Sequence, residues 1–304
     1  MLSLATPLCR DRHRSASPMT APLLLLALLL VLHTSLALLT GKNFVSSSHH
    51  RLQLASTFIP VPITQVQEAF AVNAAFSLLL LNSPQKSLTR EGLLHSTLLG
   101  LGLYSNLGLP GWSLCVLYLI FGSVVTKIKM AEKKALNIAE KRDGARGPEN
   151  VWGSAATAMM CALLSNALPA YNSLFRVGYV ASLATKISDT FSSEIGKAYG
   201  KTTYLITTLK LVPKGTEGAV SVEGTAAGVA ISVVFSLLAA ALGVMDNDFK
   251  SLVVCVVAAF VATTAESFIG AIFQDSVPWL TNELVNLINT VIGAAAAMAL
   301  YTML

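Results

Sequence analysis

Long apolar runs dominate the chain, and their lengths predict membrane-spanning helices. A helix needs roughly 20 mostly apolar residues to cross a bilayer. Runs that approach or exceed this length lie near residues 89–108, 110–126, 151–169, 219–243, 251–273 and 283–303, and a shorter run at 69–82 is a further candidate. The runs are rich in Leu and Ala without two-residue alternation, so strands are not expected anywhere. The predicted fold class is all-α: a polytopic integral membrane helical bundle of about six to seven transmembrane helices.

Glycine and proline positions predict how these helices turn and pack. In the stretch 87–112, a Gly-rich apolar helix is followed by Pro110 and Gly111, which predict a turn into the next span. Gly224 and Gly228 form a G-x-x-x-G pair at the start of another run. Such pairs allow two helices to approach closely, so we assign this one to packing and not to function.

The composition agrees with a membrane protein. Of the 304 residues, 54% are hydrophobic and only 12% are charged, whereas about a quarter of the residues of soluble domains are charged. Four widely spaced cysteines indicate neither a disulfide framework nor a metal site. The net charge of +5 gathers in residues 127–146, which hold seven Lys or Arg against three acids. This stretch is expected to face the side from which the protein inserted, or alternatively to attract a phosphorylated substrate. It contains no aromatic residue, so nucleic acid is not an expected partner.

The N-terminal residues predict two successive targeting segments. Residues 1–39 have the plan of a secretory signal, with arginines before an apolar core at 22–39 and small residues at its end. Residues 40–65 are rich in Ser and lack Asp and Glu, which is typical of a plastid transit peptide. This order resembles the bipartite leaders of algae whose plastids are wrapped in extra membranes; the alternative is that 22–39 remains as a signal anchor. The integral membrane domain is expected at 66–304, in a plastid membrane.

Ionisable residues gather at 188–225, and charged groups at membrane depth mark a functional site by default. In a helix, Asp189 and Ser193 would share one face at a spacing of four residues, whereas Glu194 would point partly aside. A break or an unwound turn would bring Asp189 and Glu194 to one ion. These carboxylates are therefore predicted to be catalytic and to bind a metal.

The segment 212–218 is predicted to be a phosphate-binding loop. Pro213, Gly215 and Gly218 exclude a regular helix there. Exposed amides together with Lys214 and the hydroxyl of Thr216 can bind anionic oxygens. The segment is not a Walker loop, because GxxxxGK[ST] does not occur in the chain.

Further polar residues lie inside or beside the later apolar runs. Glu223 precedes one run and Glu266 lies within another, while Asn286 and Asn289 share a helical face in the last run. Carboxylates suit Mg²⁺, and Mg²⁺ with lysines suits phosphoryl transfer. For Glu266, an equally good interpretation is a hydrogen bond that joins two helices.

With "SDTFSSEIGKAYGKTTYLITTLKLVPKGTEGAVSVEGT", "ESFIGAIFQ" and "NELVNLINTVIGA", the chain closely resembles the chloroplast phytyl-phosphate kinase family of the vitamin E pathway, within a wider transmembrane family shared by cyanobacteria, archaea and animals. The resemblance covers roughly residues 66–304. It implies a kinase that makes phytyl diphosphate from phytyl phosphate, or another prenyl phosphate, for tocopherol and phylloquinone synthesis and phytol salvage. A nucleoside triphosphate, expected to be CTP, would be the phosphoryl donor. Asp189 and Glu194 match the family's "DTxxSE" pair, and the glycines of the 212–218 loop match its "VP[KR]GTxG".

The mechanism expected from these residues uses one Mg²⁺ held by Asp189 and Glu194, with Glu223 as a further ligand. Lys214 is the expected catalytic lysine. The expected substrate-binding residues are Ser193, Lys210, Gly215, Thr216, Gly218, Glu266, Asn286 and Asn289, with Arg142 and Arg146 as weaker candidates.

Two other functions stay open. A transporter of a small anionic or lipidic substrate would also carry charges at mid-membrane, but commonly with two matching halves, and neither "SDTFSSEIG" nor "VPKGTEG" recurs in the chain. A structural membrane component would need no clustered carboxylates. Membrane lipid is an expected partner in each case.

Overall fold

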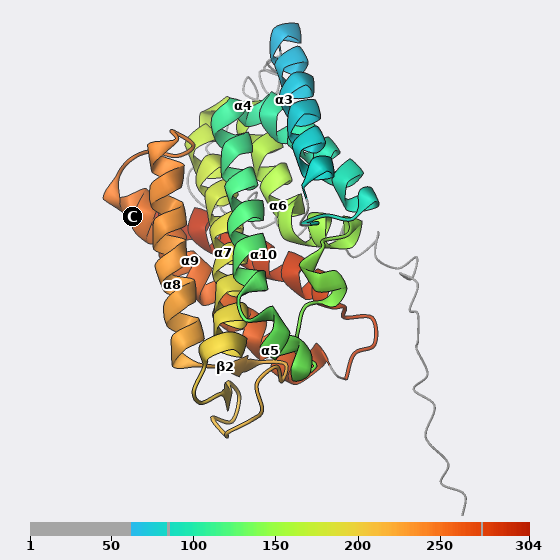
Figure 1. The fold of residues 1–304 in the computed structure, drawn as a ribbon. Helices are drawn as coiled ribbons and strands as arrows, with labels where there is room; N and C mark the ends of the chain where they lie inside the picture. The colour runs from blue at the N-terminus through green and yellow to red at the C-terminus, as the bar shows by residue number, and fades with distance from the viewer. Residues whose placement is uncertain (1–61, 84–85, 275) are drawn as a thin grey trace, which may run out of the picture.

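The computed structural model describes residues 62–304 except 84–85 and 275, and within these ranges the fold is all-α (Figure 1). The predicted targeting segments 1–39 and 40–65 lie outside the described residues, apart from 62–65. The main helices are α3 (Ile63–Asn82), α4 (Arg90–Lys127), α5 (Met130–Ala135), α6 (Pro148–Ala167), α7 (Asn172–Tyr199), α8 (Val222–Ala241), α9 (Phe249–Ile269) and α10 (Asn282–Met303). Short elements are the 3-10 turns η1 (Lys141–Gly144) and η2 (Pro169–Tyr171), the π-helical turn η3 (Gly270–Gln274), and the strands β1 (Tyr204–Leu205) and β2 (Ala219–Val220).

Four of the long helices begin at a side-chain cap. Thr89, Ser221, Asp248 and Thr281 each accept a hydrogen bond from the backbone amide three residues later, at 2.9, 3.1, 2.6 and 3.3 Å. Each cap satisfies an amide that has no partner within its helix, which is why a helix begins at these residues and not deeper in the apolar run.

The helix α4 is a hairpin, not one straight rod. Gly108 has φ 65° and ψ −165°, a backbone conformation outside the helical region that glycine adopts readily. A Cβ placed on Gly100 would lie 3.1 Å from Nε1 of Trp112, although a straight helix would separate these residues by about 18 Å. The predicted turn between the runs 89–108 and 110–126 is therefore confirmed, with the break at Gly108 just before Pro110.

The central helix of the bundle is α7, which the apolar runs did not predict. It packs against α4, α6, α8, α9 and α10, and Figure 1 shows it running through the middle of the bundle. Its charged residues lower its hydropathy, so it escapes a search for long apolar runs. Protein surrounds it, and neighbouring side chains can therefore satisfy those charges.

Five described helices are long and apolar enough to cross a membrane: α3, α4, α8, α9 with η3, and α10. The run predicted at 151–169 forms α6, which is not among these five. The G-x-x-x-G pair packs as predicted, since a Cβ on Gly224 or Gly228 would overlap Ser192 of α7. The sequence predicted no strands, and this expectation is wrong in detail. The short strands β1 and β2 pair antiparallel in the loop before α8, where polar residues and glycines interrupt the helices.

Candidate functional site

A polar cavity of about 2040 Å³ lies within the bundle, and β2 is part of its wall. Figure 1 shows β2 and α5 at the same end of the bundle. The walls of the cavity come from the basic stretch 137–150, the second half of α7, the loop 203–221, the end of α9 and the start of α10. Segments far apart in sequence thus surround one polar space in an otherwise apolar bundle. Nine residues predicted for the site or its metal line the cavity: Asp189, Ser193, Glu194, Lys214, Gly215, Thr216, Gly218, Glu266 and Asn286.

A group of four side chains, which we call the Asp189 cluster, lies where α7, α9 and α10 meet. Lys186 donates to the carboxylate of Asp189 at 2.5 Å and to the side-chain oxygen of Asn286 at 2.7 Å. The carboxyl groups of Asp189 and Glu266 lie within hydrogen-bonding reach of each other. Lys186, Asp189 and Asn286 are buried. The cluster therefore combines two carboxyl groups with a single lysine and faces the cavity.

A second group, the Glu194 cluster, lies one and a half turns further along α7. Lys133 of α5 donates to the Glu194 carboxylate and, at 2.6 Å, to the backbone oxygen of Thr126; both charged side chains are 1% exposed. Lys197 lies 3.6 Å from Glu194 and 3.7 Å from Glu140. Glu194 thus pairs with two lysines, although its Oε1 makes no hydrogen bond among the described residues. Its pair with Lys133 joins α5 to the central helix, and Lys197 joins that helix to the basic stretch through Glu140.

The structure does not bring Asp189, Glu194 and Glu223 to one ion, contrary to the prediction. The helix α7 is continuous from Asn172 to Tyr199, so carboxylates five residues apart point in different directions. Glu223 accepts a hydrogen bond from the Lys201 amide at 3.2 Å and does not line the cavity. Among the described residues, no three His, Cys, Asp or Glu side chains are grouped to hold a metal ion.

The segment 212–218 is a loop, as predicted. Gly215 and Gly218 have φ of 84° and 72°, which favour glycine. A Cβ on Gly218 would lie 2.6 Å from the Ser267 oxygen, so the missing side chain lets the loop dock against α9. The hydroxyl of Thr216 donates to the Pro213 oxygen at 2.8 Å, and this turn holds Lys214 at the cavity wall.

Two predicted site residues, Lys210 and Asn289, lie outside the cavity, and Ser193 lines it with its hydroxyl bonded to its own helix. Lys210 is exposed and Ser193 donates to the Thr190 oxygen at 3.2 Å; Ser193 lines the cavity and Lys210 does not. Asn289 is fully buried outside the cavity, and neither polar atom of its amide has a hydrogen-bond partner among the described residues. Asn286 and Asn289 share a helical face as predicted, but only Asn286 reaches the Asp189 cluster.

The basic stretch supplies a further polar group at the rim. Arg142 donates to Glu149 at 2.5 Å and to Asn150 at 2.7 Å, and Asn150 donates to Glu283 at 3.4 Å. Partial burial is the largest single effect on the pKa of Glu149 and raises it. The hydrogen bond from Arg142, the backbone amide of Glu149 itself and the positive charge of Arg142 together outweigh burial and hold this pKa below its usual range. This group joins the start of α6 to the start of α10 across the cavity mouth.

Sequence reasoning missed two buried lysines. Lys186 is a lone lysine within an apolar stretch and three residues before Asp189, so helical spacing alone could have joined the two. Lys133 had no such signal, since it looks like one of several lysines in a basic loop. Its burial against Glu194, 61 residues away, is a tertiary feature.

Comparison with known proteins places this site within a family. The family described as "Integral membrane protein DUF92" matches residues 73–294. The chain belongs to this family. The DUF92 match spans both clusters, the 212–218 loop and all the long described helices at least in part. With the helices described above, it shows that the chain is a multi-pass membrane protein.

Three known proteins are similar to this chain over most of its length. An uncharacterised membrane protein of Synechocystis sp. is 49% identical over 233 residues, which span 76% of this chain and 90% of the relative. The chloroplastic protein VTE6 of Arabidopsis thaliana is 46% identical over 216 residues, which span 69% of this chain and 64% of VTE6. An uncharacterised membrane protein of Methanocaldococcus jannaschii is 33% identical over 225 residues, which span 74% of this chain and 90% of the relative. No solved structure matches the chain.

Proposed function

We propose that the protein is a membrane-embedded phytyl-phosphate kinase. It transfers a phosphoryl group from a nucleoside triphosphate, with CTP as the expected donor, to phytyl phosphate or another prenyl phosphate. The product feeds the vitamin E pathway in a plastid membrane. The similarity to chloroplastic VTE6 supports the plastid location and a role in this pathway.

The observation that carries the proposal is the large polar cavity and its charges. Ionised side chains inside a membrane bundle are costly, and they persist where they serve a partner or a water-filled space. Here the carboxyl groups of Asp189 and Glu266 line, together with Lys186, Lys197, Lys214 and other charged residues, one cavity large enough for a nucleotide. Positioning and neutralisation of phosphate charge supply most of the catalysis in phosphoryl transfer.

The Asp189 cluster fits a magnesium ion. Mg²⁺ is commonly held by one or two carboxylates, with water and substrate phosphates completing its shell. Two carboxyl groups within hydrogen-bonding reach of each other repel when both are ionised, and Lys186 compensates only one of them. Asp189 and Glu266, with the oxygen of Asn286 nearby, would therefore hold the ion. When bound, Mg²⁺ would neutralise charge on the donor's phosphates.

The residues of the chain would then position the two substrates. Lys214 and the backbone amides of the glycine loop would bind the donor's outer phosphates at the cavity wall. A phosphate monoester is largely dianionic at neutral pH, so the acceptor needs no general base. Its oxygen forms a bond to the γ-phosphorus while the bond to the β–γ bridging oxygen breaks, which releases a nucleoside diphosphate.

A transfer assay tests this function. The full chain, purified in detergent, is incubated with Mg²⁺, phytyl phosphate and CTP or ATP labelled at the γ-phosphate, and labelled phytyl diphosphate is measured. The wild type is expected to transfer label. Asp189→Asn is expected to lower the rate about 100-fold or more, because it removes a carboxylate that would hold the Mg²⁺ ion on the donor's phosphates.

Asp246→Asn is the matched control, because Asp246 is an exposed carboxylate in the turn between α8 and α9. It should transfer label as the wild type does. Absence of transfer with either nucleotide and several prenyl phosphates, from protein shown to be folded, would overturn the kinase and favour a transporter.

A further inference from the structure

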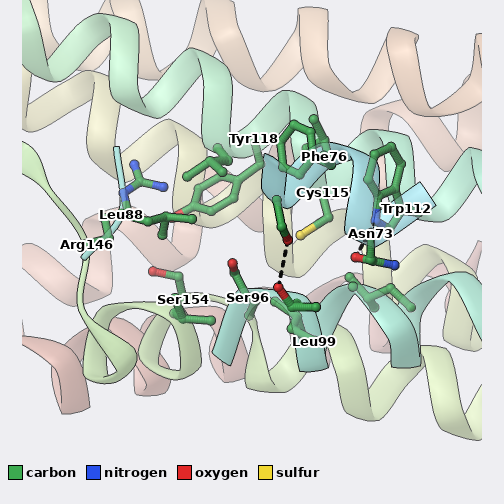
Figure 2. Close-up of a pocket in the computed structure, with 18 of the residues that line it drawn as sticks. Asn73, Phe76, Leu88, Ser96, Leu99, Trp112, Cys115, Tyr118, Arg146 and Ser154 are labelled. Atoms are coloured by element: carbon green, nitrogen blue, oxygen red, sulfur yellow. Dashed lines mark hydrogen bonds between the residues drawn. The ribbon is translucent and has the colours of Figure 1, made fainter. Parts of the chain in front are cut away.

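A second, apolar pocket lies beside the polar cavity and shares one wall with it. This pocket of about 60 Å³ lies between α3, the two halves of α4 and α6 (Figure 2). Tyr118, Arg146, Asn150 and Ser154 line both spaces. Figure 2 shows Arg146 and Leu88 at one end of the pocket and Trp112 with Asn73 at the other.

The pocket wall is largely apolar, because several of its polar groups are bonded to one another or to the backbone. Asn73 accepts from Nε1 of Trp112 at 3.1 Å, and the hydroxyls of Ser77 and Thr97 pair at 3.0 Å. Ser96 donates to the backbone of its own helix. A ligand in this pocket would therefore meet hydrocarbon and aromatic surface along most of its length.

Arg146 brings a positive charge to this wall, and its position is built into the fold. Its backbone exchanges two hydrogen bonds of 3.0 Å with Ser87 and Thr89, while its guanidinium lies 5.0 Å from the ring centre of Tyr118. A side chain at Gly122 would overlap that guanidinium, so the glycine makes room for it. Nη1 of Arg146 is buried and has no hydrogen-bond partner among the described residues. A buried guanidinium N–H without an acceptor is costly, and an anionic oxygen is the partner that suits it best.

We propose that this pocket binds the acceptor: Arg146 binds the monophosphate of a prenyl phosphate, and the first carbons of its chain occupy the apolar pocket. The proposal rests on the proposed function and names the acceptor's place in it. The phosphate would lie at the shared wall, within the polar cavity that contains the Asp189 cluster. With the prenyl chain directed away from the polar cavity, the phosphate oxygen of the acceptor would face the nucleotide donor.

The volume of the apolar pocket restricts how much of the prenyl chain it can bind. A volume of about 60 Å³ admits only a few methylene-sized groups, so most of a long isoprenoid must lie elsewhere. The neighbouring helix α3 exposes Phe70, Leu78 and Leu79 at the edge of the bundle. The remaining chain therefore leaves between α3 and α4 into the lipid.

Photolabelling tests the site without requiring catalysis. The full chain in nanodiscs of neutral lipid is labelled with a prenyl monophosphate that carries a diazirine beside its first carbons, and labelled peptides are mapped by mass spectrometry. Labels are expected on α4 near Leu99 and Cys115. Leu99→Trp fills the pocket and should lower labelling about tenfold. Leu98→Trp is the matched control, because Leu98 is 52% exposed, and it should leave labelling unchanged.

The role of Arg146 is tested in the same assay. Arg146→Gln should lower labelling about tenfold, in line with loss of a charge-assisted hydrogen bond. Gly122→Ala, which displaces the guanidinium sterically, should do the same if it stays folded. Unlabelled phytyl phosphate should compete at least about tenfold better than phytol, because only the phosphate pairs with Arg146. Phosphatidic acid is the second competitor, and equal competition by it would overturn a site for prenyl phosphates in favour of one for lipid phosphates.

The two proposals fail separately. Labels confined to other helices, or equal labelling of Leu99→Trp and Leu98→Trp, would overturn the acceptor pocket even if the protein transfers phosphate. Labelling that follows these expectations, in a folded protein that transfers no phosphate, would support the pocket and overturn the kinase.

Discussion

Asp189 and Glu194 are buried carboxylates on the same helix, five residues apart, yet their surroundings differ. Asp189 shares Lys186 with a second carboxyl group, that of Glu266. Glu194 has Lys133 and Lys197 as partners. The difference teaches that burial and sequence similarity alone do not define a metal ligand. A carboxylate that shares one lysine with a second carboxyl group can use a further cation, whereas one paired with two lysines already has counter-ions.

We predict that Glu194 stabilises the bundle, and that breaking its ion pair has the largest effect. Glu194→Gln leaves Lys133 buried without a counter-ion, which should lower the free energy of unfolding by about 3–5 kcal/mol. An SDS titration of the purified chain in mixed micelles would measure this loss. Adding Lys133→Met should recover most of it, because a buried pair can be replaced by apolar groups at little cost.

Glu132→Gln is the control for this experiment. Glu132 pairs with Lys129 in a largely exposed position, so its loss should change stability by less than about 1 kcal/mol. If Glu194→Gln folds as stably as the wild type but no longer binds Mg²⁺, then Glu194 is a metal ligand and the contrast with Asp189 fails.

The opposite role, metal binding, is predicted for the Asp189 cluster. Glu266→Gln should weaken the binding of Mn²⁺, used as a spectroscopic probe for Mg²⁺, by at least about tenfold, because one of two carboxylate ligands is lost. Electron paramagnetic resonance of free Mn²⁺ would measure the affinity. The double variant Glu194→Gln with Lys133→Met provides the comparison and should bind Mn²⁺ as the wild type does. Equal weakening in both would contradict the separation of the two clusters.

Much of the fold was predictable because local patterns determine it. The apolar runs predicted the helices that face lipid, Pro110 and Gly111 predicted the turn in α4, and the glycines of 212–218 predicted the loop. The central helix α7 was not predicted as part of the bundle core, because its polar residues are satisfied by neighbouring helices. Hydropathy along the chain does not contain that information.

The candidate site was predictable in its residue types and less so in its pairing. Asp189, Glu266 and Asn286 were singled out as polar residues in or beside apolar runs, and the structure brings them together. The predicted partnership of Asp189 with Glu194 required a break in a helix that is continuous. Lys133 was absent from the prediction because its contact with Glu194 joins segments that no local spacing relates.

Asn289 offers the smallest and sharpest test of where the polar cluster ends. It lies one turn after Asn286 on α10, close to where Gly293 packs against Thr185 of α7, and its amide has no hydrogen-bond partner among the described residues. Leaving a buried polar group unpaired costs free energy, so Asn289→Leu should leave stability unchanged or raise it by about 1 kcal/mol, with normal phosphoryl transfer.

Asn286→Leu is the matched variant, since it is the same substitution one turn earlier. It removes an acceptor from Lys186, so it should lower stability by about 1–3 kcal/mol and slow transfer as well. If Asn289→Leu instead impairs transfer as strongly as Asn286→Leu does, the working site extends along α10 into the bundle. The polar residues needed for transfer would then extend from the Asp189 cluster along α10 to Asn289. The two clusters would differ in how far they extend as well as in their charge.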